Sequence, residues 1–378
     1  MIDLDDLLEQ EFPVDSNLFY LNHAAVAPWP VRTGNAVRQF AAECVDMGAY
    51  GYADWLERES GLRIQLARLL NAASANDIAL VKNTSEGLSM VAHGFPWRSG
   101  DNVVIAAGEF PSNRIVWQSL GHAGVELRQV PLAQSDDPEL ALLAAADSRT
   151  RLLSASSVDY ATGLRLDLAR LGRQCRERGI AFCVDAIQGL GVIPHDVQGM
   201  GIDFLVADAH KWLLGPEGIA VFYSGERWRG QLTLHEYGWH MTDHPEDFER
   251  VRWQPAQTGR RFECGSPNML GIHAFSASLE LLQEIGAREL ERRVLAHARL
   301  LMEGISANPD LELLTRNEPG RYAGIVTFRH RSIATATLYH DLQNQRIVCA
   351  QRGGGIRFSP HAYHRSGMLE EVLERITT

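Results

Sequence analysis

The fold is decided by two neighbouring stretches of the chain. Residues 180–189 read IAFCVDAIQG, and residues 204–215 read FLVADAHKWLLG. Each begins with four or five consecutive apolar residues, which is typical of a strand buried on both faces of a parallel sheet. Each then turns polar, with Asp185 after the first run and Asp208 and Lys211 after the second. Ligands of such sheets bind beyond the carboxyl ends of the strands. These polar residues are therefore the first candidates for a functional site.

The same alternation of apolar runs and amphipathic stretches extends from about residue 50 to residue 225. Strands are expected at 102–107, 125–130, 151–156, 180–184, 204–207 and 219–223, with helices at 112–120, 138–146 and 167–178. This order predicts an α/β fold with a mostly parallel sheet covered by helices on both faces. The irregular segment 226–268 is rich in Trp, His, Arg and Pro, as expected of a functional loop or a domain junction. Two long helical patterns at 270–285 and 287–305, followed by shorter strands and helices, predict a smaller α+β domain.

Length and charge limit the classes of function. The chain has 378 residues, enough for two or three domains, and a net charge of −11. An acidic chain without a basic stripe is a poor candidate for binding nucleic acid or an anionic membrane. The first residues, MIDLDD, are acidic where a secretory leader is basic, and the sequence has no run of about 20 apolar residues. We expect a cytoplasmic protein that acts on a small molecule.

The cysteines and lysines are informative through their numbers. The five cysteines are widely spaced and form no CxxC pair, so we expect neither a disulfide framework nor a metal site. Of the 36 basic residues only Lys82 and Lys211 are lysines. Arginine replaces lysine as a surface cation but not as a nucleophilic amine, because the guanidinium group stays protonated. Lys211 follows a buried strand among apolar residues, which lower the pKa of an amine and favour Schiff-base chemistry. An exposed loop lysine is the alternative.

A third stretch indicates a phosphate site. Residues 83–88 read NTSEGL, in which Asn83 and Glu86 form a helix-capping pair. The hydroxyls of Thr84 and Ser85 and the N–H groups of the first helical turn are then available to bind a phosphate. Such caps are common, so the stretch gains meaning only together with Asp185 and Lys211. A phosphate cradle, a carboxylate for a pyridine nitrogen and one amine for an aldehyde are what pyridoxal 5′-phosphate (PLP) requires.

Six blocks of the sequence resemble those of a known family. They are YLNHAA at 20–25, NTSEG at 83–87, DAIQ at 185–188, HK at 210–211, FECGSPN at 262–268 and IRFSPH at 356–361. In this order they resemble the class V aminotransferase group of fold-type I PLP enzymes, which includes cysteine desulfurases, kynureninase and isopenicillin N epimerase-like proteins. The resemblance implies a seven-stranded, mostly parallel sheet in a large domain at 21–268. It also implies a small domain at 269–378, an N-terminal segment at 1–20 packed on it, and a homodimer with the site at its interface.

The resemblance also implies roles for individual residues. Lys211 would form the internal aldimine with PLP and carry the Cα proton of the substrate. Asp185 would pair with the pyridine nitrogen, Gln188 would bind the ring oxygen and Phe110 would stack on the ring. The expected phosphate contacts are Thr84, Ser85 and His210, with Ser266 from the second subunit. Asp208 is a further cofactor-binding candidate, at a position where desulfurases carry Ser. The role of Asp159, where several relatives have Asn, stays open.

Substrate contacts follow from the same resemblance. Arg357 matches the arginine that binds the carboxylate of an α-amino acid, and its planar fork suits that task. Arg352, His23 and Trp239 are further candidates. For Arg352 the alternative is a solvated surface residue, and for Trp239 it is ordinary packing.

One departure separates the chain from ordinary desulfurases. Those enzymes carry a nucleophilic cysteine in a loop between the two C-terminal arginines. Here the interval between Arg352 and Arg357 is GGGI, without cysteine and too short for a mobile loop. Persulfide chemistry of the ordinary desulfurase kind is therefore not expected. The family that the chain resembles implies a class V aminotransferase acting on an α-amino acid that the sequence does not identify. The alternatives are a lyase that cleaves a C–S or C–C bond, an epimerase, and a non-catalytic regulator with the same fold.

Overall fold

A computed structural model of the chain, which describes residues 3–376, contains a central sheet of seven strands. Their order is β2-β8-β7-β6-β5-β3-β4. The bounds are β2 Ile78–Val81, β3 Asn102–Ala106, β4 Glu126–Val130, β5 Thr150–Ser156, β6 Ala181–Asp185, β7 Phe204–Asp208 and β8 Ala220–Ser224. The pairs β3–β4, β3–β5, β5–β6 and β6–β7 are parallel. Only β8 runs against its neighbours β2 and β7. The predicted α/β class and mostly parallel sheet are confirmed.

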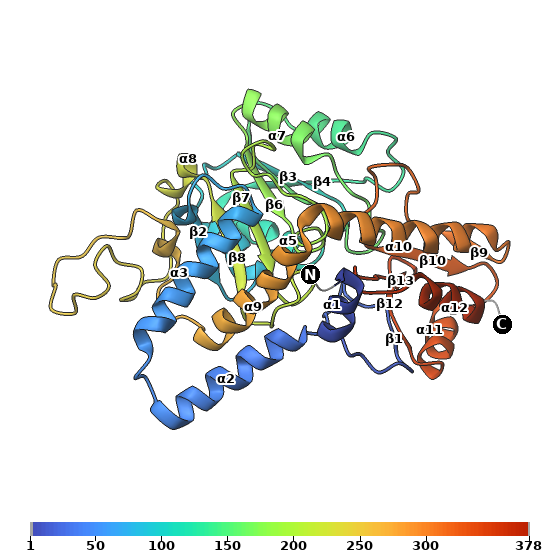
Figure 1. The fold of residues 1–378 in the computed structure, drawn as a ribbon. Helices are drawn as coiled ribbons and strands as arrows, with labels where there is room; N and C mark the ends of the chain where they lie inside the picture. Colours follow the sequence, from blue (N-terminus) through green and yellow to red (C-terminus); the bar gives the residue numbers. More distant parts are fainter. Residues whose placement is uncertain (1–2, 377–378) are drawn as a thin grey trace.

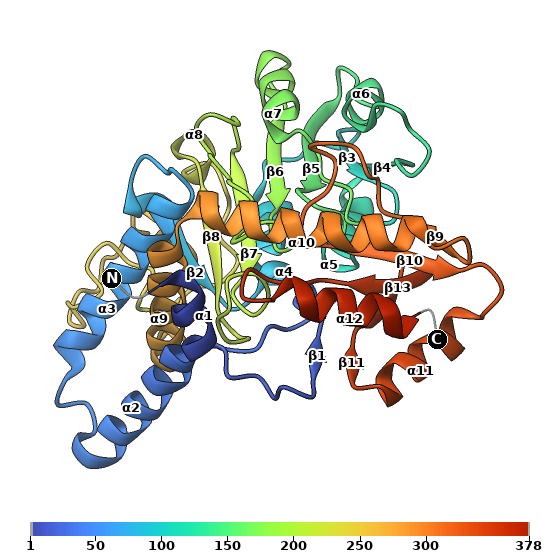
Figure 2. The same ribbon diagram turned by 45° about the vertical axis from the view of Figure 1, so that its right-hand side comes forward.

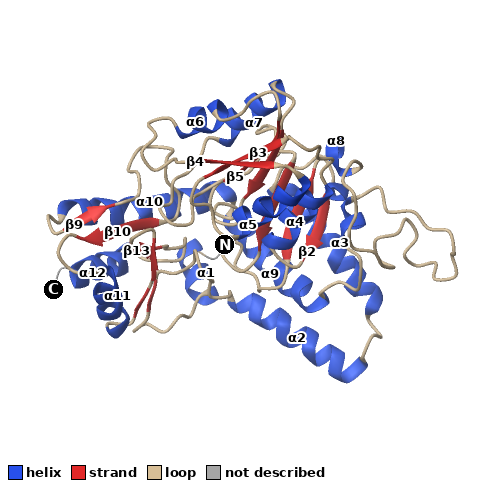
Figure 3. Cartoon of the chain, turned by 180° about the vertical axis from the view of Figure 1, so that it is seen from behind, coloured by secondary structure: helices blue, strands red, loops and turns tan. Residues whose placement is uncertain are grey.

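Helices cover both faces of this sheet (Figures 1 and 3). They are α2 Val31–Met47, α3 Tyr52–Leu69, α4 Thr84–Gly94, α5 Ser112–Gln118, α6 Pro138–Ala144, α7 Leu168–Glu177, α8 Glu226–Arg229 and α9 Met269–Ile285. Successive residues of β3 face opposite ways, because side chains alternate along a strand. Val104 joins the core beneath α3, α7 and α9, while Val103 and Ile105 join the core beneath α4 and α5. A parallel sheet buried on both faces explains the unbroken apolar runs of the sequence.

A second, smaller sheet lies beside the large one (Figure 2). Its order is β12-β13-β10-β9, with bounds β9 Leu311–Leu313, β10 Val326–His330, β12 Ala350–Arg352 and β13 Gly355–Phe358. Helices α11 (Thr335–Asn344) and α12 (Ser366–Ile376) pack with it. The long helix α10 (Ala287–Ala307) belongs to both parts. Its Leu290 and Val294 lie in the large core, and its Leu301, Met302 and Ile305 lie in the small one.

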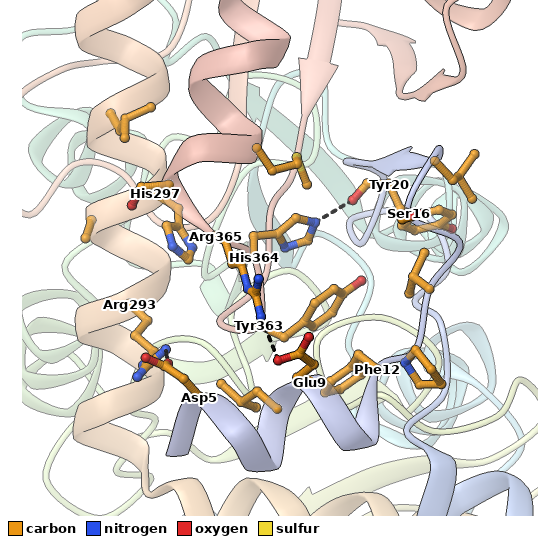
Figure 4. Close-up of a pocket in the computed structure, with 18 of the residues that line it drawn as sticks. Asp5, Glu9, Phe12, Ser16, Tyr20, Arg293, His297, Tyr363, His364 and Arg365 are labelled. Carbon is orange, nitrogen blue, oxygen red and sulfur yellow. Dashed lines mark hydrogen bonds and ion pairs between the residues drawn. The ribbon is translucent and has the colours of Figure 1, made fainter. Parts of the chain in front are cut away.

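The N-terminal segment contacts the small sheet and its helices. Strand β1 (Phe19–Tyr20) pairs in parallel with β11 (Ile347–Val348). Helix α1 (Leu4–Glu11) is held by an ion pair between Glu9 and Arg365 at 2.6 Å, drawn dashed in Figure 4. The rings of Phe12 and Tyr363 stack at 4.1 Å. Residues 1 and 2, which the sequence places in this segment, lie outside the described residues. Within the described chain, the helices are all too short or too polar to cross a membrane.

Candidate active site

The polar residues that follow β6 and β7 meet at one edge of the large sheet. The two strands are parallel neighbours, with Asp185 opposite Val206 in the register. Asp185 is the last residue of β6, Asp208 is the last residue of β7, and Lys211 follows three residues later. All three are buried, with exposed fractions of 2% for Asp185 and 8% for each of the others. The strand-end argument therefore located this cluster correctly.

Burial tunes the amine of Lys211. Desolvation lowers the pKa of Lys211 to about 8, opposed by the negative charge of Asp185 and assisted by the positive charge of Arg357. An amine in this range is partly neutral near physiological pH, as a Schiff-base nucleophile must be. Its Nζ lies 5.6 Å from the centre of the Phe110 ring, which is 38% exposed. The other lysine, Lys82, is exposed and forms an ion pair with Glu86 at 2.8 Å.

Asp185 is a buried carboxyl group with few donors. It accepts one backbone hydrogen bond, from the N–H of Ile187 at 3.1 Å. Burial raises the pKa of Asp185 to about 6, while that bond and the charge of Lys211 act in the opposite direction. A cation close to the Asp185 carboxylate, in addition to Lys211, would stabilise its ionised form. A protonated pyridine nitrogen is a cation of the required kind.

The N-terminus of α4 carries the expected phosphate residues. Asn83 caps the helix as predicted, accepting the N–H of Glu86 at 2.9 Å. The reciprocal half of the capping pair is wrong, because the Glu86 carboxylate accepts the N–H of Lys82 instead of that of Asn83. The Thr84 N–H and hydroxyl both contact Asp208 Oδ2 at 3.2 Å, and the Ser85 hydroxyl donates to Ser112 Oγ at 2.8 Å.

Two polar atoms in this corner are buried without a partner within residues 3–376. They are Asp208 Oδ1 and His210 Nδ1. Desolvation lowers the pKa of His210 to about 4, so its ring is neutral. Nδ1 can then either donate or accept a hydrogen bond, depending on the tautomer. Unpartnered buried polar atoms are costly in a folded protein. Because Asp208 lies beside the N-terminus of α4, these unpartnered atoms indicate a binding site for a polar ligand.

Gln188 and His23 lie together on the small-domain side of Lys211. Gln188 Nε2 donates to the carbonyl of Ala24 at 3.0 Å, and Trp212 Nε1 donates to Gln188 Oε1 at 3.0 Å. His23 is fully buried, with Nδ1 2.9 Å from the carbonyl oxygen of Ser359 and Nε2 2.9 Å from the hydroxyl of Tyr363. A direct contact between His23 and a substrate would require one of these bonds to break.

Arg357 is a buried cation without an acidic partner. Its Nη1 donates to the carbonyl of Tyr160 at 2.7 Å, and its Nε has no partner in the described chain. Burial lowers the pKa of Arg357 to about 10, with a further lowering from the charge of Arg352, while Asp159 opposes both. Arg352 is exposed at the end of β12, and within the described residues it bonds only to the carbonyl of Gln351. Two neighbouring guanidinium groups without a salt bridge among residues 3–376 form a site for an anion such as a carboxylate.

The structure gives Asp159, whose role the sequence left open, a local task. One oxygen, Oδ1, accepts the N–H groups of Ala161 at 3.1 Å and Thr162 at 2.6 Å, and the Thr162 hydroxyl at 2.7 Å. The carboxylate therefore fixes the turn that presents the Tyr160 carbonyl to Arg357.

Two predicted residues lie apart from this cluster. Ser266 lines a small cavity with Lys82, Glu86 and Cys264, and within the described chain it forms no hydrogen bond with Thr84, Ser85 or His210. Trp239 is 39% exposed in the long loop before η3 (Gly259–Phe262), where its ring lies 5.1 Å from that of His240. Since the structure is of a single chain, the predicted contact of Ser266 with the site of a second subunit stays a prediction.

Sequence reasoning missed Glu109, which lies directly before Phe110. Its side chain is buried and accepts the N–H of Ser156 at 2.8 Å, together with the Ser156 hydroxyl. Burial raises the pKa of Glu109 to about 8. An acidic residue just beyond the strand at 102–107 was the available signal, and it follows the same strand-end rule that identified Asp185. Glu109 ties the end of β3 to β5 and so fixes the segment that carries Phe110.

Comparison with known proteins identifies the family. The profile of the family described as Aminotransferase class-V matches residues 19–364. The chain belongs to the class-V aminotransferase family. Among its members, a cysteine desulfurase of Klebsiella pneumoniae is 32% identical over 82% of this chain and 77% of its own length. A probable cysteine desulfurase of Methanothermobacter thermautotrophicus is 28% identical over 98% of this chain and 97% of its own length.

Two solved structures of another protein share the fold of this chain. C-DES, in a mutant with glycine covalently linked to its PLP cofactor, superposes with a TM-score of 0.91 at 23% identity, covering 97% of this chain and 98% of its own. A second structure, a complex of the cystine C–S lyase C-DES with its product cysteine persulfide, gives a TM-score of 0.90 at 24% identity and the same coverage. Both support the fold-type I architecture predicted from the sequence.

The cofactor of this class-V family member is PLP, and the residues present suit it. The unpartnered Asp208 Oδ1 belongs to a side chain that contacts Thr84 at the terminus of α4, where a phosphate is expected, and His210 Nδ1, two residues further along, also lacks a partner in the described chain. The buried Asp185 is suited to a pyridine nitrogen, and Phe110 is available to cover the ring. Lys211, the buried member of the two lysines, has the lowered pKa that imine formation requires. When bound, PLP withdraws electrons from the Cα of an attached amino acid.

Proposed function

We propose that this chain is a PLP-dependent lyase that cleaves the Cβ–S bond of a cysteine-type amino acid by β-elimination. The sequence alone favoured transamination, with such a lyase as the alternative. The relatives named as cysteine desulfurases, and the likeness to a protein named a cystine C–S lyase, support the alternative more strongly. Transamination and elimination both begin with loss of the Cα proton, so the residues around Lys211 serve either reaction.

The short connection between β12 and β13 favours elimination over transfer of sulfur to a cysteine of the enzyme. The two strands are joined by Gly353 and Gly354 alone, with φ angles of +60° and +78°. Positive φ at both central residues is the geometry of a two-residue type I′ hairpin. A turn of this kind has no room for the loop in which desulfurases hold their nucleophilic cysteine.

The remaining cysteines near this region are poor acceptors of sulfur. Cys349 lies in the small core, and burial raises the pKa of its thiol to about 12. Burial and the neighbouring Glu236 also raise the pKa of Cys264. Thiols with raised pKa values are weak nucleophiles, because the thiolate is the reactive form. We infer that sulfur leaves on a fragment of the substrate and not on a cysteine of the enzyme.

Each step of the reaction then has a residue. Arg357, with the Tyr160 carbonyl orienting its guanidinium group, binds the substrate carboxylate. Lys211 Nζ accepts the Cα proton, and its lowered pKa makes the neutral amine available for this. Asp185 holds the proton on the pyridine nitrogen. Overall, R–S–CH2–CH(NH3⁺)–COO⁻ and water give R–SH, pyruvate and ammonium, so the Cβ–S bond breaks without any oxidant.

Product analysis tests this proposal. Purified enzyme loaded with PLP is incubated with cysteine and with cystine, without a keto acid. We expect stoichiometric pyruvate and ammonium together with sulfide or persulfide, and none of these with Lys211→Ala. Alanine as the product would instead indicate desulfurase chemistry on a protein thiol. Accumulation of pyridoxamine phosphate, reversed by adding a keto acid, would show that the enzyme is an aminotransferase. Racemised substrate without cleavage would indicate epimerisation.

We also propose that the enzyme works as a homodimer in which each subunit supplies its Ser266 to the site of the other. Large apolar side chains are exposed at the tip formed by α2 and α3 and in the long loop at 237–253, including Val45, Tyr50 and Val251. Exposed apolar clusters of this kind are typical of subunit interfaces. Light scattering should give twice the chain mass of 42.0 kDa. A monomer that retains full PLP affinity would refute the arrangement.

A further inference from the structure

Asp208 occupies the helix terminus at which the phosphate of PLP is expected to bind. Its Oδ2 accepts both the backbone N–H and the hydroxyl of Thr84, each at 3.2 Å. Its own N–H donates to Thr84 Oγ1, also at 3.2 Å. Thr84 is the first residue of α4, an eleven-residue helix. The carboxyl group thus takes the donors that an anion at this helix terminus would use.

The second oxygen of this carboxyl group has no donor. Asp208 is 8% exposed, and its Oδ1 is among the buried atoms without a hydrogen-bond partner in the described chain. A phosphate placed at the same helix terminus would add repulsion between two anions at close range. A proton on Oδ1 removes both difficulties at once, because it supplies a donor and cancels the charge.

We propose that Asp208 takes up one proton when a phosphate binds at α4, so that its Oδ1–H donates a hydrogen bond to the phosphate. The proton comes from solvent, one for each phosphate bound, and only the O–H bond is formed. The inference rests on the PLP site and does not depend on which reaction the enzyme catalyses. It makes Asp208 a phosphate ligand whose charge limits the affinity of the site as the pH rises.

The groups around Asp208 are consistent with this proton uptake. Burial raises the pKa of Asp208 to about 6, although the Thr84 bonds and the charge of Lys211 oppose the rise. The negative charge of Glu217, in the segment before β8, contributes to the rise, and that of Asp185 on β6 also faces the site. His210 is neutral, because burial lowers its pKa to about 4. Between pH 7 and 8.5 the carboxyl group is therefore ionised before the phosphate arrives.

Titration calorimetry with pyridoxine 5′-phosphate tests the proposal. This probe carries the ring and the phosphate but no aldehyde, so it leaves the Lys211 amine unmodified. Measurements in two buffers of different ionisation enthalpy give the number of protons taken up. We expect wild-type protein to take up about one proton more than Asp208→Asn at pH 8. The ratio of the wild-type Kd to the Asp208→Asn Kd should grow about tenfold between pH 7 and pH 8, above the second ionisation of the phosphate near 6.

Two further variants make the test decisive. Asp203→Asn changes a half-buried aspartate whose pKa is also raised by desolvation, at the opposite end of β7, and should retain the wild-type proton uptake. Asp208→Ser keeps a hydroxyl at the site and should behave like Asp208→Asn. If one of the two variants fails to fold, the other still provides the test. Equal proton uptake by wild type and both Asp208 variants would overturn the proposal. So would weaker binding by both variants across the whole range. Because the readout is probe binding, these results are independent of the product analysis above.

Discussion

At the scale of single residues, Arg357 is the group whose surroundings most clearly require a ligand. It is 2% exposed, it has no salt bridge among residues 3–376, and the charged neighbour with the largest effect on its pKa is another arginine, Arg352. Burying a cation in this way is unfavourable unless an anion completes the site. Arg352 is exposed to solvent, so its charge is not desolvated to a comparable extent.

Replacing each arginine by lysine separates their roles. Arg357→Lys keeps the charge but loses the planar pair of donors, so we expect KM to rise about 10- to 100-fold, since hydrogen bonds to charged groups contribute about 1.5–3 kcal/mol. The kcat should change less, because the reacting atoms are untouched. Arg352→Lys should alter KM less than about threefold, as is usual for an exposed charge. Steady-state kinetics checks both, and equal effects would contradict the assignment.

The sequence could predict residues whose place follows from local pattern and could not predict those held by distant partners. Asp185 and Lys211 follow from the rule that ligands bind beyond the strand ends. The bond of Thr84 to Asp208 spans 124 positions, and the bonds of His23 reach residues 336 and 340 positions away. Nothing in the local sequence encodes such pairs. For the same reason the sequence implied a substrate contact for His23, whereas both its ring nitrogens are engaged within the protein.

At the scale of elements, the hairpin between β12 and β13 packs against the turn whose Tyr160 carbonyl accepts a hydrogen bond from Arg357. A Cβ added to Gly353 would lie 3.0 Å from the carbonyl oxygen of Ala161, in the turn that holds Arg357. A Cβ added to Gly354 would meet nothing within 4 Å. Both glycines have positive φ, so alanine at either costs about 1–2 kcal/mol of backbone strain.

The two glycines therefore form a matched pair for mutation. Both Gly353→Ala and Gly354→Ala should lower the free energy of unfolding by a similar amount, measured by urea denaturation. Only Gly353→Ala should also raise KM, by about three- to tenfold, since it displaces the turn around Tyr160 by the few tenths of an ångström that the added Cβ requires. A KM effect of the same size in Gly354→Ala would show that the turn is not the cause.

Helix α3 is anchored to the loops beneath it by a buried network of charges. Arg63 bonds to the carboxylates of both Glu59 and Glu263, and Glu263 also accepts the N–H of Leu80 at 2.8 Å. His240 lies 3.9 Å from Glu59 and 3.7 Å from Glu263. Glu59, His240 and Glu263 converge as metal ligands do, but the guanidinium group of Arg63 already bonds to both carboxylates and offsets one of their two negative charges.

Removing Arg63 should therefore destabilise the protein strongly. Arg63→Ala leaves two buried carboxylates uncompensated, for which about 3–5 kcal/mol is expected. Arg58 on the same helix offers a control, because its ion pair with Glu280 is exposed on both sides. Arg58→Ala should cost less than about 1 kcal/mol. Urea denaturation of both variants measures the difference, and a loss below 1 kcal/mol for Arg63→Ala would refute the role of the network.

Strands with strong patterns were predictable, and short edge strands were not. The apolar runs located β3 and β5 to β8 to within one or two residues, because burial on both faces leaves an unbroken signal. Strands β1, β9, β11 and β12 have only two or three residues, too few for any periodicity. The antiparallel placement of β8 between β2 and β7 also depends on strand order, which is set by packing across the whole sheet.

At the scale of the whole molecule, the N-terminal segment, α10 and the end of β13 meet in a buried group of histidines. His23, His297, His361 and His364 contribute, with ring centres of His23 lying 5.3 Å from His361 and 5.4 Å from His364. Figure 4 shows His297 and His364 beside Tyr363, next to α1 and α10. Trp212, the neighbour of Lys211, stacks on His361 at 5.9 Å. The group therefore joins the PLP site to the small sheet.

This histidine group should make the protein sensitive to acid. Burial lowers the pKa of His361 to about 3 and that of His364 to about 4, and it lowers the pKa of His23 well below 6.5. The folded state holds these rings neutral, whereas the unfolded chain protonates them near pH 6.5. Their contribution is thus fully present above pH 6.5 and is lost as the pH falls towards 4, at about 1.4 kcal/mol per pH unit for each ring.

Urea denaturation between pH 7.5 and pH 5 measures this loss, with secondary structure followed by circular dichroism. His361→Gln removes one titrating ring, so the dependence of unfolding free energy on pH should become shallower by about 1.4 kcal/mol per unit below pH 6.5. The side chain of His330, the last residue of β10, is only partly buried and lies outside this histidine group, so His330→Gln serves as the control variant. An identical pH dependence in wild type and His361→Gln would mean that the rings accept protons without unfolding. The junction between the two sheets would then be looser than its packing indicates.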